Sequence, residues 1–280
     1  MKLSKRRIQK LQKHIFLWWR KHRRNLPWRQ THNPYRIVVS EIMLQQTQVS
    51  RVLLRYAEFI KAFPTVQKLS KATPAAVLRI WKGMGYNRRA LYLHKMAKTV
   101  MAEYGGKFPK SEKLLTKLPG LGTYTARAVL VFAYRQELAA VDTNIRKIIT
   151  HFFFDDTPQK EKIIQEAAAV VMPKGKSWEW HQALMDYGAL ELYNLKRPER
   201  LSRAKSRDSR RTSIPFKDSN RFFRGRIIDM LREKDMKELE LIDEYIGKYD
   251  RSEDFILSII AGLQKDALVV RKNGIISLPE

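Results

Sequence analysis

The chain has 280 residues, 44% of them apolar, which is enough for one large domain and a smaller one. Its 55 basic and 28 acidic residues leave a formal charge of +27, which favours a polyanionic partner: DNA, RNA or an anionic lipid surface. The absence of cysteine excludes disulfides, thiolate nucleophiles, thiolate zinc sites and ordinary cysteine-ligated iron–sulfur clusters. No continuous apolar run predicts a leader peptide or a membrane span, so we expect a cytoplasmic or nucleoid-associated protein.

Helical periodicity dominates the chain up to about Asn194. Apolar segments with helical spacing are separated by glycine and proline, for example at Asn33-Pro34, Gly105-Gly106 and Pro119-Gly120. This pattern predicts roughly ten short helices and no strand.

The segment from Lys196 to Ser213 is rich in arginine and serine and has almost no apolar residue, so we predict a basic linker over residues 196–218. Three helices are predicted after it, over residues 220–234, 237–249 and 252–265. Asn273-Gly274 then lies between two β-prone runs, which is a strong hairpin signal. Three helices and a hairpin indicate a winged-helix-like module over residues 219–280, and the alternative is a small helical cap that completes the main core.

The segment from Leu118 to Ala126 joins two predicted helices through two glycines spaced by one residue. Glycines let the backbone turn sharply, and the new helix presents free N–H groups and its positive dipole end to an anion. A DNA phosphate would fit there, although a helix–helix turn that needs glycine for its geometry alone is the alternative. The predicted phosphate-binding residues are Pro119, Gly120, Leu121, Gly122 and Thr123.

Two carboxylates stand in contrasting positions. Glu41 lies inside an otherwise apolar helix, where desolvation raises the pKa of a carboxyl and equips it as a general acid. Asp142 directly precedes an apolar-periodic helix, where an N-cap accepts backbone N–H bonds that favour its ionised form. When two carboxyl groups in one site have different pKa values, the one with the higher pKa can act as the general acid and the ionised one as an electrostatic stabiliser. The alternatives are an ordinary exposed glutamate and a simple helix cap.

The sequence resembles the helix-hairpin-helix (HhH-GPD) superfamily of DNA glycosylases, and most closely its adenine-excising members. The resemblance covers about residues 10–195 and rests on several motifs in the family's order and spacing. These motifs are SEIMLQQTQV (40–49), GMGY (83–86), LPGLGTYTA (118–126), VDTN (141–144) and QALMDYGA (182–189). It implies an all-α, two-lobed helix-hairpin-helix glycosylase domain over residues 1–195, followed by the winged-helix-like module.

The resemblance also implies roles for single residues. Glu41 would protonate the leaving purine and Asp142 would stabilise the oxocarbenium-like sugar, with Tyr124 close to both. Bifunctional relatives carry a lysine nucleophile at the position of Tyr124, and a phenol cannot form that Schiff base, so excision without strand cleavage is expected. Other implied residues line the pocket of the flipped base, wedge into the base stack or contact the DNA beside it: Arg24, Trp28, Arg29, Gln46, Thr47, Tyr86, Asn144 and Asp186.

Two features of the family pattern are absent. Most relatives end the catalytic domain with four cysteines that ligate a [4Fe-4S] cluster, and bacterial adenine glycosylases commonly add a Nudix-like domain that checks for 8-oxoguanine. This chain has no cysteine, so a cysteine-ligated cluster cannot form. No nucleotide-binding motif or metal-ligand cluster is visible either, so we expect no other metal or cofactor, although a hairpin of this class can coordinate a monovalent cation through its carbonyls.

The leading interpretation is a monomeric, monofunctional enzyme that removes adenine opposite 8-oxoguanine or guanine from double-stranded DNA. The segment Met43 to Gln48 favours adenine. The alternatives are removal of thymine or uracil opposite guanine, and a catalytically silent DNA-binding protein that retains the fold.

Overall fold

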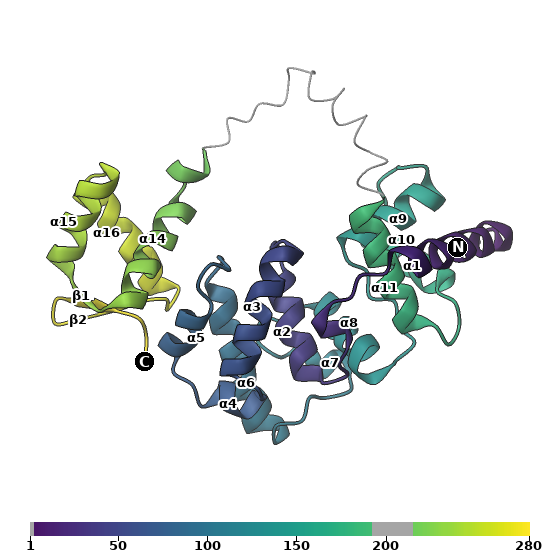
Figure 1. Cartoon of the computed structure of the whole chain (residues 1–280), viewed down its shortest axis with the longest axis horizontal. Coiled ribbons are helices and arrows are strands. Elements are labelled where there is room, and N and C mark those ends of the chain that lie inside the picture. Colours follow the sequence, from purple (N-terminus) through teal and green to yellow (C-terminus); the bar gives the residue numbers. More distant parts are fainter. Residues whose placement is uncertain (1–2, 192–214) are drawn as a thin grey trace, which may run out of the picture. The chain divides into compact units, whose positions relative to one another are not determined.

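A computed structural model describes residues 3–191 and 215–280 (Figure 1). Backbone contacts divide the chain into two compact units. The first consists of Met1–Glu41, Pro109–Lys117 and Leu121–Arg210, and the second of Ile42–Phe108, Leu118–Gly120 and Arg211–Glu280. The predicted domains differ from these units, because residues 42–108 group with the C-terminal module.

The first unit is built from helices around one apolar core. Its elements are α1 (Lys5–His22), η1 (Pro27–Arg29), most of α2 (Pro34–Leu44), α7 (Glu112–Leu115), α8 (Thr123–Tyr134), α9 (Thr143–Phe154), α10 (Glu161–Val171) and α11 (Ser177–Leu190). Helices α1, α9, α10 and α11 pack around Ile15, Ile148 and Trp180, whose side chains are at most 1% exposed. Burial of such side chains stabilises the unit by roughly 1.5–3 kcal/mol each.

The second unit contains a four-helix lobe. Its helices are α3 (Val49–Ala62), α4 (Val66–Ser70), α5 (Pro74–Ile80) and α6 (Arg88–Tyr104). Phe59, Leu69 and Trp81 are fully buried in its core. The indole of Trp81 also donates a hydrogen bond of 3.1 Å to the Gly85 carbonyl, which fastens the loop after α5 to the core.

The C-terminal module belongs to the same unit. It consists of η2 (Phe216–Asp218), α14 (Asn220–Glu233), β1 (Met236–Lys237), α15 (Glu238–Tyr249), α16 (Glu253–Lys265), β2 (Val270–Lys272) and β3 (Ile275–Ser277). The antiparallel sheet has the order β1-β3-β2. Buried Arg232 donates to the Leu78 carbonyl at 2.9 Å, and the Ala75 N–H donates to the Pro279 carbonyl at 2.8 Å, so the module is fastened to α5 at two points.

The predicted fold class is confirmed: the described residues are mostly helical, and three helices and a hairpin form the C-terminal module. Asn273 and Gly274 have φ values of +52° and +71°, as the tight turn predicted there requires. The predicted start of a helix at Lys237 is wrong, because Met236 and Lys237 pair with β3 as the strand β1. A two-residue strand is too short to show an alternating pattern.

Most of the predicted basic linker, residues 196–214, lies outside the described residues. The end of that predicted linker is structured, since Phe216–Asp218 forms η2 and the Phe216 ring lies 5.7 Å from that of Phe222. Across residues 3–191 and 215–280, the structure contains no helix with the length and apolar character needed to cross a bilayer.

Candidate active site

Glu41 is held inside helix α2 of the first unit. The residues on either side, from Val38 to Met43, are buried, and Glu41 itself is only 8% exposed. Burial raises the pKa of Glu41 to about 7, helped by the nearby charge of Asp142 and opposed by a hydrogen bond from Tyr124 and by the charge of Arg29. The predicted rise of this pKa is confirmed, and the carboxyl retains its proton over much of the range up to neutral pH.

Tyr124 is the second residue of helix α8, which follows directly on the hairpin. Its hydroxyl donates a hydrogen bond to Glu41, and burial together with the two carboxylates raises the pKa of Tyr124 well above its ordinary value. The phenol therefore remains neutral and acts as a donor. Tyr124 and the two carboxylates predicted for catalysis, Glu41 and Asp142, are thus brought together within the first unit.

Asp142 is the N-cap of α9, as predicted. One of its oxygens accepts from the Ile145 N–H at 2.7 Å, and the other accepts from the Asn144 amide at 3.2 Å. The predicted lowering of its pKa is wrong. Burial raises the pKa of Asp142, and the hydrogen bonds from Ile145 and Asn144 only oppose that rise. The sequence shows the cap but not the burial, which is created by segments distant along the chain.

His181 supports the segment that leads to Asp142, and no sequence motif indicated it. Its Nε2 accepts from the Ala140 N–H at 2.8 Å, and its Nδ1 lies 2.6 Å from the Ser177 carbonyl. These partners require a neutral ring that donates from Nδ1, and burial accordingly lowers the pKa of His181. The imidazole fixes the backbone two residues before the cap.

Asp186 of helix α11 is the centre of a buried ion cluster, and its side chain is fully buried. It accepts hydrogen bonds from the Trp19 indole (2.9 Å), from the N–H (3.2 Å) and Nε (2.5 Å) of Arg24, and from both terminal nitrogens of Arg29 (2.7 and 2.9 Å). Burial raises the pKa of Asp186, but Arg29 and Arg24 more than offset this, so the pKa lies below its ordinary value. The carboxylate is ionised and saturated with donors.

The ion cluster is linked to Glu41 through Arg29. Arg29 is shared between Asp186, with which it makes two hydrogen bonds, and Glu41, whose pKa its charge lowers. Trp28, one residue earlier in η1, is buried. The predicted pocket residues Arg24, Trp28, Arg29 and Asp186 are therefore all parts of the first unit, and their contact with a base stays a prediction.

Gly188 provides a test of how Asp142 is supported. A Cβ at Gly188 of α11 would lie 2.6 Å from the Asn144 Cβ, which no real contact tolerates. We expect Gly188→Ala to displace Asn144 and with it Asp142, and to destabilise the fold by about 1–3 kcal/mol. Urea unfolding would measure this effect.

Gly247→Ala is the matched control, because a Cβ on this glycine of α15 meets nothing within 4 Å. There, alanine should stabilise by roughly 0.5–1 kcal/mol, since it restricts the unfolded chain. Equal behaviour of the two variants would contradict close packing at Gly188.

The hairpin between α7 and α8 has the backbone that its glycines predict. Gly120 has φ +81°, and a Cβ there would lie 2.9 Å from that of Tyr92. Gly122 is the N-cap of α8 with open space around its Cα, so an anion can approach the first N–H groups of the helix. Leu121 is buried, so it can contribute only backbone atoms, and Pro119 and Thr123 flank the turn. Phosphate binding stays a prediction.

Gln46, Thr47 and Tyr86 lie on two loops of the second unit. Gln46 and Tyr86 have φ values of +52° and +45°, which non-glycine residues rarely adopt and which cluster at functional sites. Both side chains are exposed, Tyr86 by 37%.

Arg89 fastens these two loops to each other, and sequence reasoning missed it. Its guanidinium is buried and donates hydrogen bonds to both loops. On the first loop it donates to the Gln45 carbonyl (2.6 Å) and the Thr47 hydroxyl (3.0 Å), and on the second to the Met84 carbonyl (3.0 Å). Burial lowers the pKa of Arg89 to about 10, so it stays charged at neutral pH.

Known proteins resemble this chain over about two thirds of its length. The profile described as "HhH-GPD superfamily base excision DNA repair protein" matches residues 39–173. The adenine DNA glycosylase of Mycolicibacterium smegmatis is 40% identical over 62% of this chain and 61% of its own length. The thymine/uracil-DNA glycosylase of Methanothermobacter thermautotrophicus is 32% identical over 63% of this chain and 81% of its own length.

A solved structure of a thermostable thymine-DNA glycosylase aligns with a TM-score of 0.62 and 29% identity, over 66% of this chain and 87% of that one. The chain covers less than two thirds of the length of the adenine glycosylase with which it shares 40% identity. The residues matched by the family profile, 39–173, include Glu41, Tyr124 and Asp142. The chain belongs to the HhH-GPD superfamily of base excision DNA repair proteins.

Proposed function

We propose that this protein is a monofunctional DNA glycosylase that removes adenine mispaired with 8-oxoguanine or guanine. The observation that carries the proposal is the pair formed by buried Glu41 and half-buried Asp142 with Tyr124 beside it, in which Glu41 has a pKa of about 7. A protonated carboxyl in a dry site is what a leaving base needs as its acid.

The reaction follows from this arrangement. The base must first leave the duplex, because its glycosidic bond is not accessible within the stack. Glu41 then donates its proton to the adenine as the bond between C1′ and the base nitrogen breaks, and the electron pair leaves with the base. Asp142 stabilises the positive charge that develops on the sugar. Water then adds to C1′ and gives up one proton, which returns to the Glu41 carboxylate, so that an abasic site is left and the acid is restored. The growing positive charge also favours the ionised form of Asp142 and so offsets the effect of its burial.

The choice of base rests on the relatives. The adenine DNA glycosylase described above shares 40% identity with the chain, more than the thymine/uracil-DNA glycosylase does, and this favours adenine as the excised base. Removal of thymine or uracil is the second candidate activity, since the chain covers 81% of the length of the thymine/uracil-DNA glycosylase. We further propose that the enzyme acts as a monomer on double-stranded DNA, without an iron–sulfur cluster, in the cytoplasm or nucleoid.

One set of duplexes separates the candidates. The protein is incubated with labelled duplexes that contain A opposite 8-oxoguanine, A opposite G, T opposite G or U opposite G, and abasic sites are then cleaved with alkali. We expect strand breaks from the two adenine duplexes only. Breaks only from the thymine or uracil duplexes would establish the second candidate, and none at all would favour a DNA-binding protein without activity.

The monofunctional character has its own test at Tyr124. Because its hydroxyl reaches Glu41, we expect Tyr124→Lys to bring an amine to the sugar and to add strand cleavage, with a covalent complex trapped by borohydride. Trapping should increase with pH, since two carboxylates beside the amine keep it protonated. Thr123→Lys, at the exposed neighbouring residue, should give no trapping. Equal trapping by both variants would contradict the position of Tyr124.

A further inference from the structure

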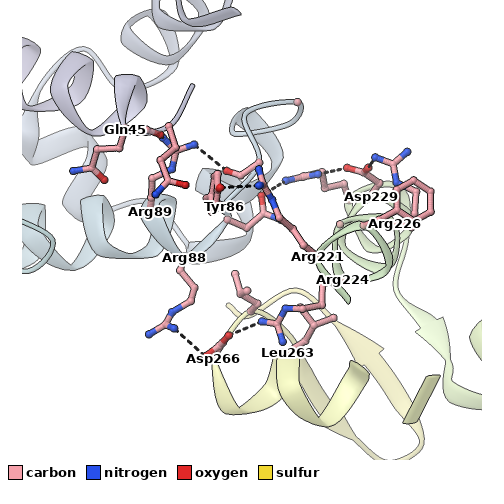
Figure 2. Close-up of a pocket in the computed structure, with 18 of the residues that line it drawn as sticks. Gln45, Tyr86, Arg88, Arg89, Arg221, Arg224, Arg226, Asp229, Leu263 and Asp266 are labelled. Atoms are coloured by element: carbon pink, nitrogen blue, oxygen red, sulfur yellow. Dashed lines mark hydrogen bonds and ion pairs between the residues drawn. The ribbon is translucent and has the colours of Figure 1, made fainter. Parts of the chain in front are cut away.

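The second unit contains a cavity of about 1050 Å³ lined by its lobe and its C-terminal module. Eight arginines and two aspartates line it, an excess of six positive charges. Figure 2 shows Arg221 of α14 beside Tyr86, and Arg224 of the same helix directed toward Asp266. Cations gathered in this way repel one another, and a bound anion relieves that repulsion.

The two aspartates neutralise only some of these arginines. Asp266 pairs with Arg224 at 2.5 Å and with Arg88 at 3.4 Å (Figure 2). Asp229 pairs with Arg226 and Arg232. In the parts of the chain that the structure describes, no carboxylate lies within ion-pair distance of Arg221, and its guanidinium donates only to the Tyr86 hydroxyl, at 2.6 Å. Arg221 lines the cavity, and its other N–H donors have no hydrogen-bond partner among the described residues.

Aromatic rings stand beside the cations. The Arg221 guanidinium lies 3.6 Å from the centroid of the Tyr86 ring, and Arg89 lies 5.4 Å from it. Tyr92 and Phe216, which also line the cavity, are 37% and 61% exposed. Arginines for phosphates together with exposed rings for bases are what a nucleic-acid strand requires of a protein groove.

The basic face of the module is not the one that a winged helix ordinarily presents to DNA. Its third helix, α16, begins with Glu253 and Asp254 and has Lys265 as its only basic residue. In the wing, which is the hairpin of β2 and β3, Arg271 is already paired with Glu238 at 2.7 Å. Helix α14 instead carries four arginines, three of which are accompanied by the carboxylates described above. The arginines of the module are therefore gathered on α14, and Arg221 is the one among them without a carboxylate partner in the described residues.

We propose that this cavity binds the backbone of the DNA strand opposite the one being repaired, with Arg221 and Arg51 on its phosphates. The inference rests on the proposed function, which brings the adenine to Glu41. The carboxylates and the N-terminus of α8 belong to the first unit, whereas the cavity lies wholly in the second, so each unit has a site for one strand. Gln46 and Tyr86, with their left-handed backbones, line the cavity where the strands would separate.

The test removes Arg51 and Arg221, which line the cavity and have no carboxylate partner among residues 3–191 and 215–280. Arg51→Ala with Arg221→Ala is made in the Glu41→Gln background, so that the duplex is not consumed, and Lys265→Ala with Lys272→Ala is the control that loses the same charge from α16 and the wing. Binding of a duplex with A opposite 8-oxoguanine is followed by fluorescence anisotropy at several salt concentrations. Hydroxyl-radical footprints are recorded with each strand labelled separately.

We expect the arginine variant to bind roughly tenfold more weakly than the control, and the slope of log K against log salt to fall by about 2. Protection should be lost on the strand opposite the adenine and kept on the adenine strand. Equal affinity of the two variants, loss confined to the adenine strand, or tighter binding of an RNA duplex would overturn the inference. The footprint is independent of turnover, so failure of the excision experiment leaves it readable.

Discussion

Replacement of Glu41 by glutamine is expected to abolish excision while duplex binding persists. The amide keeps the shape of the side chain and can still accept from Tyr124, but its N–H groups are far too weakly acidic to protonate the base. Loss of a general acid costs on the order of 10²–10⁴ in rate. Single-turnover excision and anisotropy would measure the two effects, with Glu103→Gln on the exposed surface of α6 as the control. Unchanged turnover would remove Glu41 from its proposed role.

The same substitution is expected to stabilise the fold at alkaline pH. The folded pKa of Glu41 is about 7 against an ordinary value of 4.5, so between these values the folded chain holds a proton that the unfolded chain has released. Stability contributed by this proton is complete below about 4.5 and is lost as the pH rises through about 7. Above pH 7 the free energy of unfolding is therefore lower than below pH 4.5 by about 3 kcal/mol, and the glutamine variant does not lose this stability.

Urea unfolding at pH 5 and pH 8 tests this linkage. The advantage of Glu41→Gln over the wild type should be larger at pH 8, and excision by the wild type should decline as the pH rises through about 7, because the acid is then ionised. An advantage that is the same at both pH values would show that the carboxyl is not buried as described.

The sequence predicted much of the fold because its signals are local. Apolar spacing located the helices, Asn273-Gly274 located the hairpin, and the apolar neighbours of Glu41 indicated its raised pKa. These features depend on residues within about one or two helical turns, where spacing is informative.

The parts that could not be predicted depend on contacts between distant segments. His181 meets Ala140 across 41 positions, and Arg89 meets Gln45 across 44. The same reason explains the error at Asp142: its cap is local, whereas its burial, and hence the direction of its pKa, comes from the tertiary fold.

Removal of the charge of Asp186 is expected to be the most destabilising single change in the ion cluster. Asp186→Asn leaves two buried or half-buried guanidinium groups without their counter-ion and turns an amide N–H toward at least one of them. Breaking a buried pair in this way costs about 3–5 kcal/mol. Asp155→Asn is the matched control, because this aspartate is 88% exposed and lies 3.7 Å from Arg7; it should change stability by less than about 0.5 kcal/mol.

The pH dependence distinguishes loss of the ion pairs from general damage. Because the folded pKa of Asp186 is depressed, its contribution is present above its unfolded pKa, near 3.8, and is lost as the pH falls through the folded value. The difference in free energy of unfolding between the wild type and Asp186→Asn should therefore become smaller on acidification. Asp186→Glu should recover part of the lost stability at neutral pH. Activity supplies a second measurement: Arg29, released from Asp186, would attract Glu41 more strongly, lower its pKa, and move the alkaline decline of excision to lower pH. A decline that stays where it is in the wild type would mean that Arg29 does not couple the cluster to the acid.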